Sequence, residues 1–179
     1  AKTCTLVPDK WQSLVFVDHI SDHLVELYKV MPTGTKYVHR GTSKKDHGTY
    51  ALSKKQQDEI IQDFKDGKTR TLIATDAFRA GVDIPQLRVV IQAASGSSEI
   101  EVIQEALRGS RTLPEERRVA LGVTEKTHFV LIDFLDNHED TLANMAQKRM
   151  AYYKKQGWTV KVVKRPEDID WYAFEKEKI

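Results

Sequence analysis

The sequence has little that would cross-link the chain or place it in a membrane. It contains a single cysteine, Cys4, which excludes an internal disulfide and a cysteine-based zinc site and fits a reducing, cytoplasmic setting. No apolar run approaches the roughly 20 residues that span a bilayer, so we expect no membrane partner. The net charge of +2 is nearly neutral, so a nucleic-acid site would have to be a local patch.

Three nucleotide-binding signatures are also missing. The chain has no G-x-x-x-x-G-K-[ST] loop to hold phosphates and no D-E-x-[DH] segment to hold Mg²⁺. It also has no G-x-G-x-x-G after a strand, which argues against an unrelated nucleotide-sugar or methyl-transfer enzyme. If the protein uses a nucleotide, another domain must supply most of the binding site.

Strand and helix patterns alternate along the 179 residues, a length typical of one domain. Strands are predicted at 14–17, 36–40, 71–74, 87–91, 129–134 and 158–163. Helices are predicted at 22–30, 54–65, after the loop 95–98, at 139–156 and at about 166–177. Residues 1–13 are interpreted as an irregular lead-in and 112–126 as a mixed-charge connector. The alternation favours an α/β fold with a doubly wound, mostly parallel sheet of about six strands and helices on both faces.

Local signals mark the ends of two of these helices. Ser53 and Gln56 form a capping-box signature at the start of the helix at 54–65, and Asp66-Gly67 ends it. Ser21 is predicted to cap the helix at 22–30.

The stretch from Thr71 to Pro85 combines a buried strand with a polar turn. An apolar run ends at Thr75 and Asp76, which we place at the carboxyl end of a strand, where ligands bind in open α/β sheets. Gly81 lacks a Cβ, so a backbone or a phosphate can come close. Asp83 precedes Pro85 by two residues. It is as consistent with a residue that orders the turn as with one that contacts a ligand.

Gln104, Arg108 and Arg111 follow at steps of four and three residues. On a helix these side chains share one face. Two guanidinium groups and an amide on one face suit a polyphosphate, because a guanidinium is planar, always charged and binds phosphate oxygens in pairs. The alternative to a phosphate site is that Arg108 and Arg111 are two surface arginines on an exposed helix.

Other polar residues follow predicted strands, and each keeps a simpler interpretation. His39 and Gly41 precede a basic loop that is more often a solvated surface than a ligand contact, and Arg79 fits a phosphate contact or a solvated charge. Asp18 and His19 follow the first strand. His19 with Asp22 or His23 could suggest a metal cluster, but no third ligand has suitable spacing, so we expect no metal site. The charged pairs Lys148-Arg149 and Lys154-Lys155 are interpreted as a solvent-facing side of a helix, and Tyr152 and Tyr153 as packing residues.

Several of these blocks resemble the motifs of superfamily 2 helicases, in the family's order. Residues 74–85 resemble motif V, Gln104-x-x-Leu107-Arg108-x-x-Arg111 resembles motif VI, and residues 14–17 resemble motif IV. Leu107 departs from the glycine usual in motif VI. The tail, with 133–136, Arg149-x-x-Tyr152 and 157–158, is most similar to phage and bacterial DNA-repair helicases of the UvsW type.

The resemblance implies a RecA-like C-terminal domain and assigns roles to residues. Arg108 would be the arginine finger, supported by Arg111 and Gln104, and Gly81 and Asp83 would contact the nucleotide. The implied nucleic-acid contacts are Asp18, His19, His39, Gly41, Thr75, Asp76 and Arg79.

The implied ligands and partners follow from the same resemblance. ATP with Mg²⁺ would be bound mainly by an N-terminal RecA-like domain, DNA is favoured over RNA, and the setting would be a bacterial or phage-infected cell. We expect the chain, which starts without methionine, to be part of a longer protein and inactive alone as an ATPase. The alternative is a non-catalytic RecA-like module that binds nucleic acid or a protein.

Overall fold

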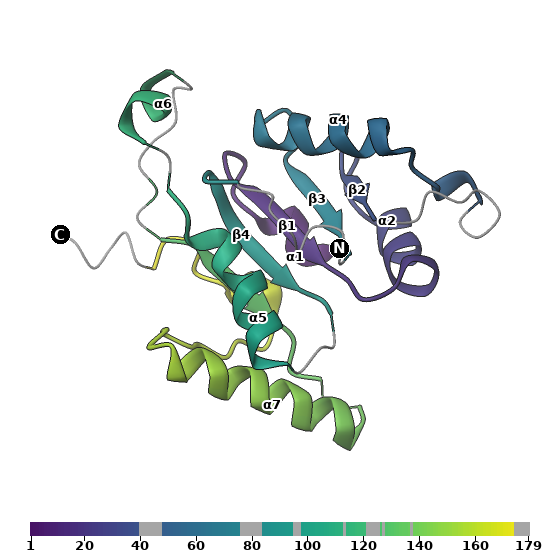
Figure 1. Cartoon of the computed structure of the whole chain (residues 1–179). Helices are drawn as coiled ribbons and strands as arrows, with labels where there is room; N and C mark the ends of the chain where they lie inside the picture. Colours follow the sequence, from purple (N-terminus) through teal and green to yellow (C-terminus); the bar gives the residue numbers. More distant parts are fainter. Residues whose placement is uncertain are drawn as a thin grey trace.

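A computed structural model of the chain describes residues 1–39, 48–75, 84–94, 98–112, 114–120, 126, 128–136 and 138–173 (Figure 1). Five strands in this part of the chain form one sheet in the order β2-β3-β1-β4-β5. Their bounds are β1 Gln12–Phe16, β2 Lys36–Val38, β3 Thr71–Ala74, β4 Leu87–Gln92 and β5 Val130–Asp133. Every neighbouring pair is parallel. The chain starts in the middle and adds strands on both sides, which confirms the predicted doubly wound topology.

Two apolar clusters cover the two faces of the sheet, because successive side chains of a strand point to opposite sides. Leu14 and Phe16 belong to one cluster, whereas Val15 belongs to the other. Leu14 lies in register with Leu72 of β3 and Val90 of β4, and both are fully buried. Burial on both faces explains why the central strands have continuous apolar sequences.

Helix α4 (Lys54–Lys65) covers the face to which Leu14 points, through Phe64. Its predicted cap is confirmed, because Ser53 Oγ accepts a hydrogen bond from the backbone N–H of Gln56 at 3.3 Å. In return, the Gln56 side chain accepts from the backbone N–H of Ser53 at 2.9 Å. The helix ends as expected, with Gly67 at a φ of 76° that favours glycine.

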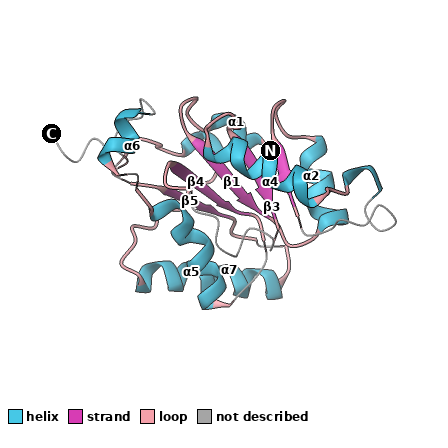
Figure 2. Cartoon of the chain, turned by 45° about the horizontal axis from the view of Figure 1, so that its top comes forward, coloured by secondary structure: helices cyan, strands magenta, loops and turns pink. Residues whose placement is uncertain are grey.

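Helices α5 (Glu99–Ala106) and α7 (Asp140–Lys155) lie side by side (Figure 2). Gln92 is two residues after Val90 in β4, so its side chain points to the same face as Val90, the face that α4 covers. It donates a hydrogen bond to Glu105 of α5 at 2.7 Å. The ammonium of Lys155 in α7 lies 2.8 Å from the carboxylate of Glu99 in α5.

The opposite face is covered by the N-terminal residues and by the chain after β1. Helix α1 (Lys2–Leu6), the π-helical turn η1 (Ile20–Leu24) and α2 (Val25–Lys29) pack there. Trp11 is buried at their edge, with the Arg88 guanidinium 5.2 Å from its ring and Trp171 in edge contact. Helix α1 corrects the expectation of an irregular lead-in.

Other predicted boundaries also need correction. The helix predicted at 22–30 begins at Ile20 with His19 as its N-cap, so Ser21 is not the cap. The connector contains a short helix, α6 (Glu115–Ala120). The expected terminal helix is a single 3₁₀ turn, η5 (Pro166–Asp168), within the described residues. A further 3₁₀ turn, η2 (Gly48–Tyr50), precedes α4.

The sixth strand predicted at 158–163 does not form, and most of this segment is exposed. Trp158 stacks on Tyr153 of α7 with ring centroids 5.8 Å apart, and its edge meets Phe129. Gly157 ends α7 with a φ of 75°. Packing of the indole ring against α7 therefore holds this segment beside the helix, away from the sheet.

A buried charge network joins β5 to α7. Arg149 is 5% exposed and donates two hydrogen bonds to Asp133, from Nε at 2.8 Å and from Nη2 at 3.0 Å. The hydroxyl of Tyr153 donates to Asp133 at 2.8 Å. Burial raises the pKa of Tyr153, and the charge of Asp133 raises it further, so the hydroxyl stays a donor. The expectation that Lys148-Arg149 forms a solvent face is therefore wrong for Arg149.

Arg149→Met should lower the free energy of unfolding by about 3–5 kcal/mol, because it leaves the partly buried carboxylate of Asp133 without its cation. Lys148→Met is the matched control, since Lys148 is exposed on the same helix, and should change stability by less than about 0.5 kcal/mol. Urea unfolding measures both variants. Equal losses would contradict the network's importance.

Candidate functional site

The two arginines singled out by the sequence lie beyond the end of α5. The α-helix ends at Ala106 and tightens into a 3₁₀ turn, η4 (Leu107–Ser110). Gln104 is exposed on α5, Arg108 is half-buried in η4, and Arg111 is exposed after it with an extended backbone (φ −72°, ψ 145°). The expectation of one continuous helical face is thus wrong past Ala106. We call residues 107–111 the arginine turn.

Lys126 ties the arginine turn to the start of β4. Its ammonium donates to the carbonyl oxygens of Gly109 at 2.8 Å, Pro85 at 2.8 Å and Leu87 at 3.1 Å. Leu87 is the first residue of β4, so the arginine turn lies at the amino end of that strand. Pro85 is the last residue of the stretch that resembles motif V, so the arginine turn lies close to the end of that stretch.

Gly109 lets the arginine turn sit directly on an aromatic ring. A Cβ at this position would lie 2.6 Å from Cδ2 and 2.9 Å from Cγ of Phe129, distances that real contacts do not reach. Glycine is therefore required for the present position of the turn. No local sequence signal marks Gly109 or Lys126, because both act through long-range contacts.

A second group of residues lies at the carboxyl edge, where the carboxyl ends of the parallel strands meet. Thr75 follows β3, is buried, and its N–H donates to the Val38 carbonyl of β2 at 3.3 Å. Asp18 and His19 follow β1, and His19 is exposed. The N–H of Asp18 donates to His23 Nδ1 at 3.4 Å, and burial lowers the pKa of His23, which favours the neutral, accepting imidazole.

His39 also follows a strand at this edge, but its ring is fully buried. Its Nε2 lies 2.8 Å from the carbonyl oxygen of Tyr50, and its ring stacks parallel to Tyr37 at 5.8 Å. A direct contact between this side chain and a nucleic-acid strand is incompatible with that position. The sequence-based assignment of His39 is corrected to a residue that holds Tyr50 against β2.

Five of the predicted site residues lie outside the described part of the chain: Gly41, Asp76, Arg79, Gly81 and Asp83. Among the residues that are described, no three His, Cys, Asp or Glu side chains gather as metal ligands. The same residues contain no helix long and apolar enough to cross a bilayer.

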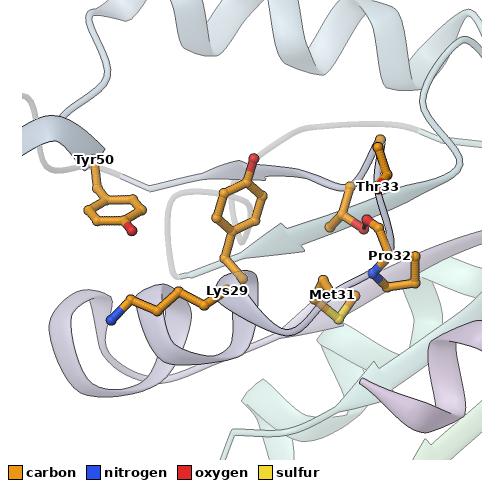
Figure 3. A pocket seen from close by; sticks show the side chains of 8 residues that line it. Lys29, Met31, Pro32, Thr33 and Tyr50 are labelled. Atoms are coloured by element: carbon orange, nitrogen blue, oxygen red, sulfur yellow. Dashed lines mark hydrogen bonds between the residues drawn. The ribbon is translucent and has the colours of Figure 1, made fainter.

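A surface hollow of about 330 Å³ lies between α2 and the chain leading into β2 (Figure 3). Lys29, Pro32 and Tyr50 are among its lining residues. The Lys29 ammonium is paired with Glu26 at 2.6 Å, and Gly34 adopts a φ of 89° in the turn that bounds the hollow. The residues that line the hollow bring no acid–base or nucleophilic pair together.

Comparison with known families identifies the chain. The model of the helicase conserved C-terminal domain matches residues 2–112, which include β1 to β4, α5 and the arginine turn. The chain belongs to this family. As a helicase C-terminal domain, it has the expected RecA-like fold, and the motif resemblance in the sequence is confirmed.

Curated relatives match parts of this helicase C-terminal domain. It is 33% identical to ATP-dependent DNA helicase MPH1 of Pyricularia oryzae over 88 residues, 49% of this chain and 8% of that protein. It is 30% identical to DNA 3'-5' translocase XPB2 of Sulfurisphaera tokodaii over 79 residues, 44% of this chain and 18% of that protein. A third match, ATP-dependent RNA helicase DHX58 of Mus musculus, is 36% identical over 63 residues, covering 35% and 9%. The chain thus spans a small part of each relative.

Two solved structures share the fold. T4 UvsW superimposes with a TM-score of 0.57 at 16% identity, covering 90% of this chain and 33% of that one. Lhr of Mycobacterium smegmatis, solved with ssDNA and AMP-PNP bound, superimposes with a TM-score of 0.53 at 20% identity, covering 84% and 18%.

Gly109→Ala should destabilise the domain by about 1–3 kcal/mol, because the new methyl group overlaps the Phe129 ring. Chemical denaturation measures the loss. In a Phe129→Ala background the same substitution should cost less, since most of the ring is gone. An equal cost in both backgrounds would show that Phe129 does not set the position of the arginine turn.

Proposed function

We propose that this chain is the second motor domain of an ATP-dependent helicase or translocase. The observation that carries the proposal is the separation of the two groups of site residues. The arginine turn is tied by Lys126 to the amino end of β4, whereas Thr75, Asp18 and His19 follow strands at the carboxyl edge. One rigid sheet therefore offers two surfaces, one suited to a triphosphate and one to a strand of nucleic acid.

The nucleotide surface rests on the arginine turn. Arg108 would reach the γ-phosphate of ATP held with Mg²⁺ mainly by an N-terminal RecA-like domain, with Arg111 and Gln104 supporting it and Gly81 and Asp83 contacting the nucleotide. An arginine finger stabilises the charge that develops on the transferring phosphoryl group. The names of two curated relatives as ATP-dependent helicases, and the AMP-PNP bound to Lhr, support this use of ATP.

The nucleic-acid surface is the carboxyl edge. Asp18 and His19 would contact the sugar–phosphate backbone there, with Thr75, Gly41, Asp76 and Arg79 as further proposed contacts. Thr75 is buried, so its contact would require its hydroxyl to become exposed when the strand binds. DNA is the favoured substrate because two relatives are named for DNA and Lhr holds ssDNA. Several other relatives are named RNA helicases, so RNA is the second substrate to test.

A motor cycle follows from this arrangement. ATP would close the cleft between two RecA-like domains and bring Arg108 into the catalytic site, and hydrolysis would reopen it. Because the strand-gripping edge belongs to the same rigid body as the arginine turn, each closure would move the grip along the strand.

Arg108→Ala, made in the full natural protein that contains this chain, should lower the kcat for ATP hydrolysis about 10³-fold or more. The ATP affinity should fall much less, because the finger acts on the transition state. Arg165→Ala is the matched control, since Arg165 is exposed and its ion-pair partner among the described residues is the nearby Asp168, at 2.9 Å. Hydrolysis by the Arg108 variant at the wild-type rate would contradict the finger and favour a non-catalytic binding module.

Lys126→Met should release the arginine turn from the start of β4 and lower kcat by a smaller factor than Arg108→Ala. The physical reason is that methionine keeps the aliphatic length of lysine but bonds none of the three carbonyls. Steady-state ATPase assays with excess nucleic acid measure kcat and KM separately. An unchanged kcat in a variant that melts at the wild-type temperature would show that the turn does not need this tie.

A further inference from the structure

An aromatic ring stands exposed at the carboxyl edge without an assigned role. Phe134 follows β5 directly and is 47% exposed, and the next residue, Leu135, is 45% exposed. The strand order places β5 three strands away from β3, which Thr75 follows. At roughly 4.8 Å per strand, Phe134 lies about 14 Å along the edge from Thr75. That span is about four nucleotides at 3.4 Å per stacked nucleotide.

The backbone beneath this ring is held firmly. The N–H of Phe134 donates to Asp133 Oδ1 at 2.7 Å, and its carbonyl accepts from Arg149 Nη2 at 3.3 Å. The same Asp133 and Arg149 form the buried network between β5 and α7. The exposed ring is therefore attached to a backbone that hydrogen bonds hold in place. Little backbone conformational entropy would be lost when a ligand binds the ring.

The surroundings favour a base over a phosphate. A hollow beside the ring has two ionisable side chains in its lining, Arg149 and Asp136. The positive charge of Arg149 is paired with Asp133, and Asp136 is acidic, so the lining does not favour a phosphate. This hollow, of about 70 Å³, also contains Gln92, whose Oε1 is buried without a hydrogen-bond partner among the described residues. An aromatic face accepts any base.

We propose that Phe134 is a stacking platform for one nucleobase of the single strand that crosses the carboxyl edge. The proposal rests on the proposed function, because it needs the strand to run along this edge. Stacking on Phe134 would be a contact with the face of a base. The other contacts proposed at this edge are with the phosphates of the strand. Stacking of this kind tolerates every base and gives grip without sequence preference.

The test is a binding titration of the full natural protein with a labelled oligothymidylate and with an abasic oligonucleotide of the same length. Phe134→Ala should weaken oligothymidylate binding about 5- to 150-fold, which corresponds to the 1–3 kcal/mol typical of base–aromatic stacking. It should leave abasic binding and the salt dependence of affinity unchanged, because no phosphate contact is lost. Phe134→Tyr should bind like the wild type.

Leu135→Ala is the matched control, since it removes a neighbouring apolar side chain of similar exposure that has no ring. It should leave binding unchanged, and thermal unfolding of each variant checks the fold. Wild-type affinity in Phe134→Ala, or an equal loss for the abasic strand, would overturn the stacking platform while leaving the proposed function intact. Failure of the wild-type protein to bind either oligonucleotide would overturn the nucleic-acid edge itself.

Discussion

The parallel direction of the five strands in the described part of the chain decides where each proposed functional side chain lies. In a parallel sheet the carboxyl ends open at one edge, and each connection returns to the other edge before the next strand begins. Thr75, His19 and Phe134 follow strands and so share the carboxyl edge. Helix α5 runs back from β4, and this return carries Arg108 to the opposite end of the strand. Separation of the two surfaces is thus a consequence of topology.

Long-range polar contacts then fix the two surfaces in detail. At the amino end of β4, one ammonium, that of Lys126, bonds three carbonyls from two segments that are distant in sequence. At the carboxyl edge, Asp133 and Arg149 hold the backbone of Phe134 from both sides. Both contacts link loops to the buried sheet, whose apolar core is closely packed.

The features that sequence predicted correctly are those set by near neighbours in the chain. The apolar runs of β1, β3 and β4, the reciprocal cap between Ser53 and Gln56, and the glycine stop at Gly67 depend on residues within a few positions of each other. The helicase motifs were likewise recognised, because the family keeps their residues in contiguous blocks.

The features that sequence missed depend on partners far along the chain. In the sequence Arg149 is indistinguishable from a surface charge, because its counter-ion, Asp133, lies 16 residues earlier. Its spacing from Ala146 and Tyr153, which are buried, does indicate the inward side of α7. The segment after Gly157 has strand-like composition, but Trp158 packs on Tyr153 instead. His39 has the right place for a strand contact, yet its ring is bonded to Tyr50.

The central claim is that one rigid domain presents the arginine turn and the strand-binding edge at opposite ends of its sheet. The most direct measurement is a structure of the full natural protein with a non-hydrolysable ATP analogue and a single-stranded oligonucleotide. The account predicts the Arg108 guanidinium within hydrogen-bond distance of the γ-phosphate and the strand lying across Thr75 at the carboxyl edge. A γ-phosphate contacted at the carboxyl edge, or a strand bound beside the arginine turn, would contradict it.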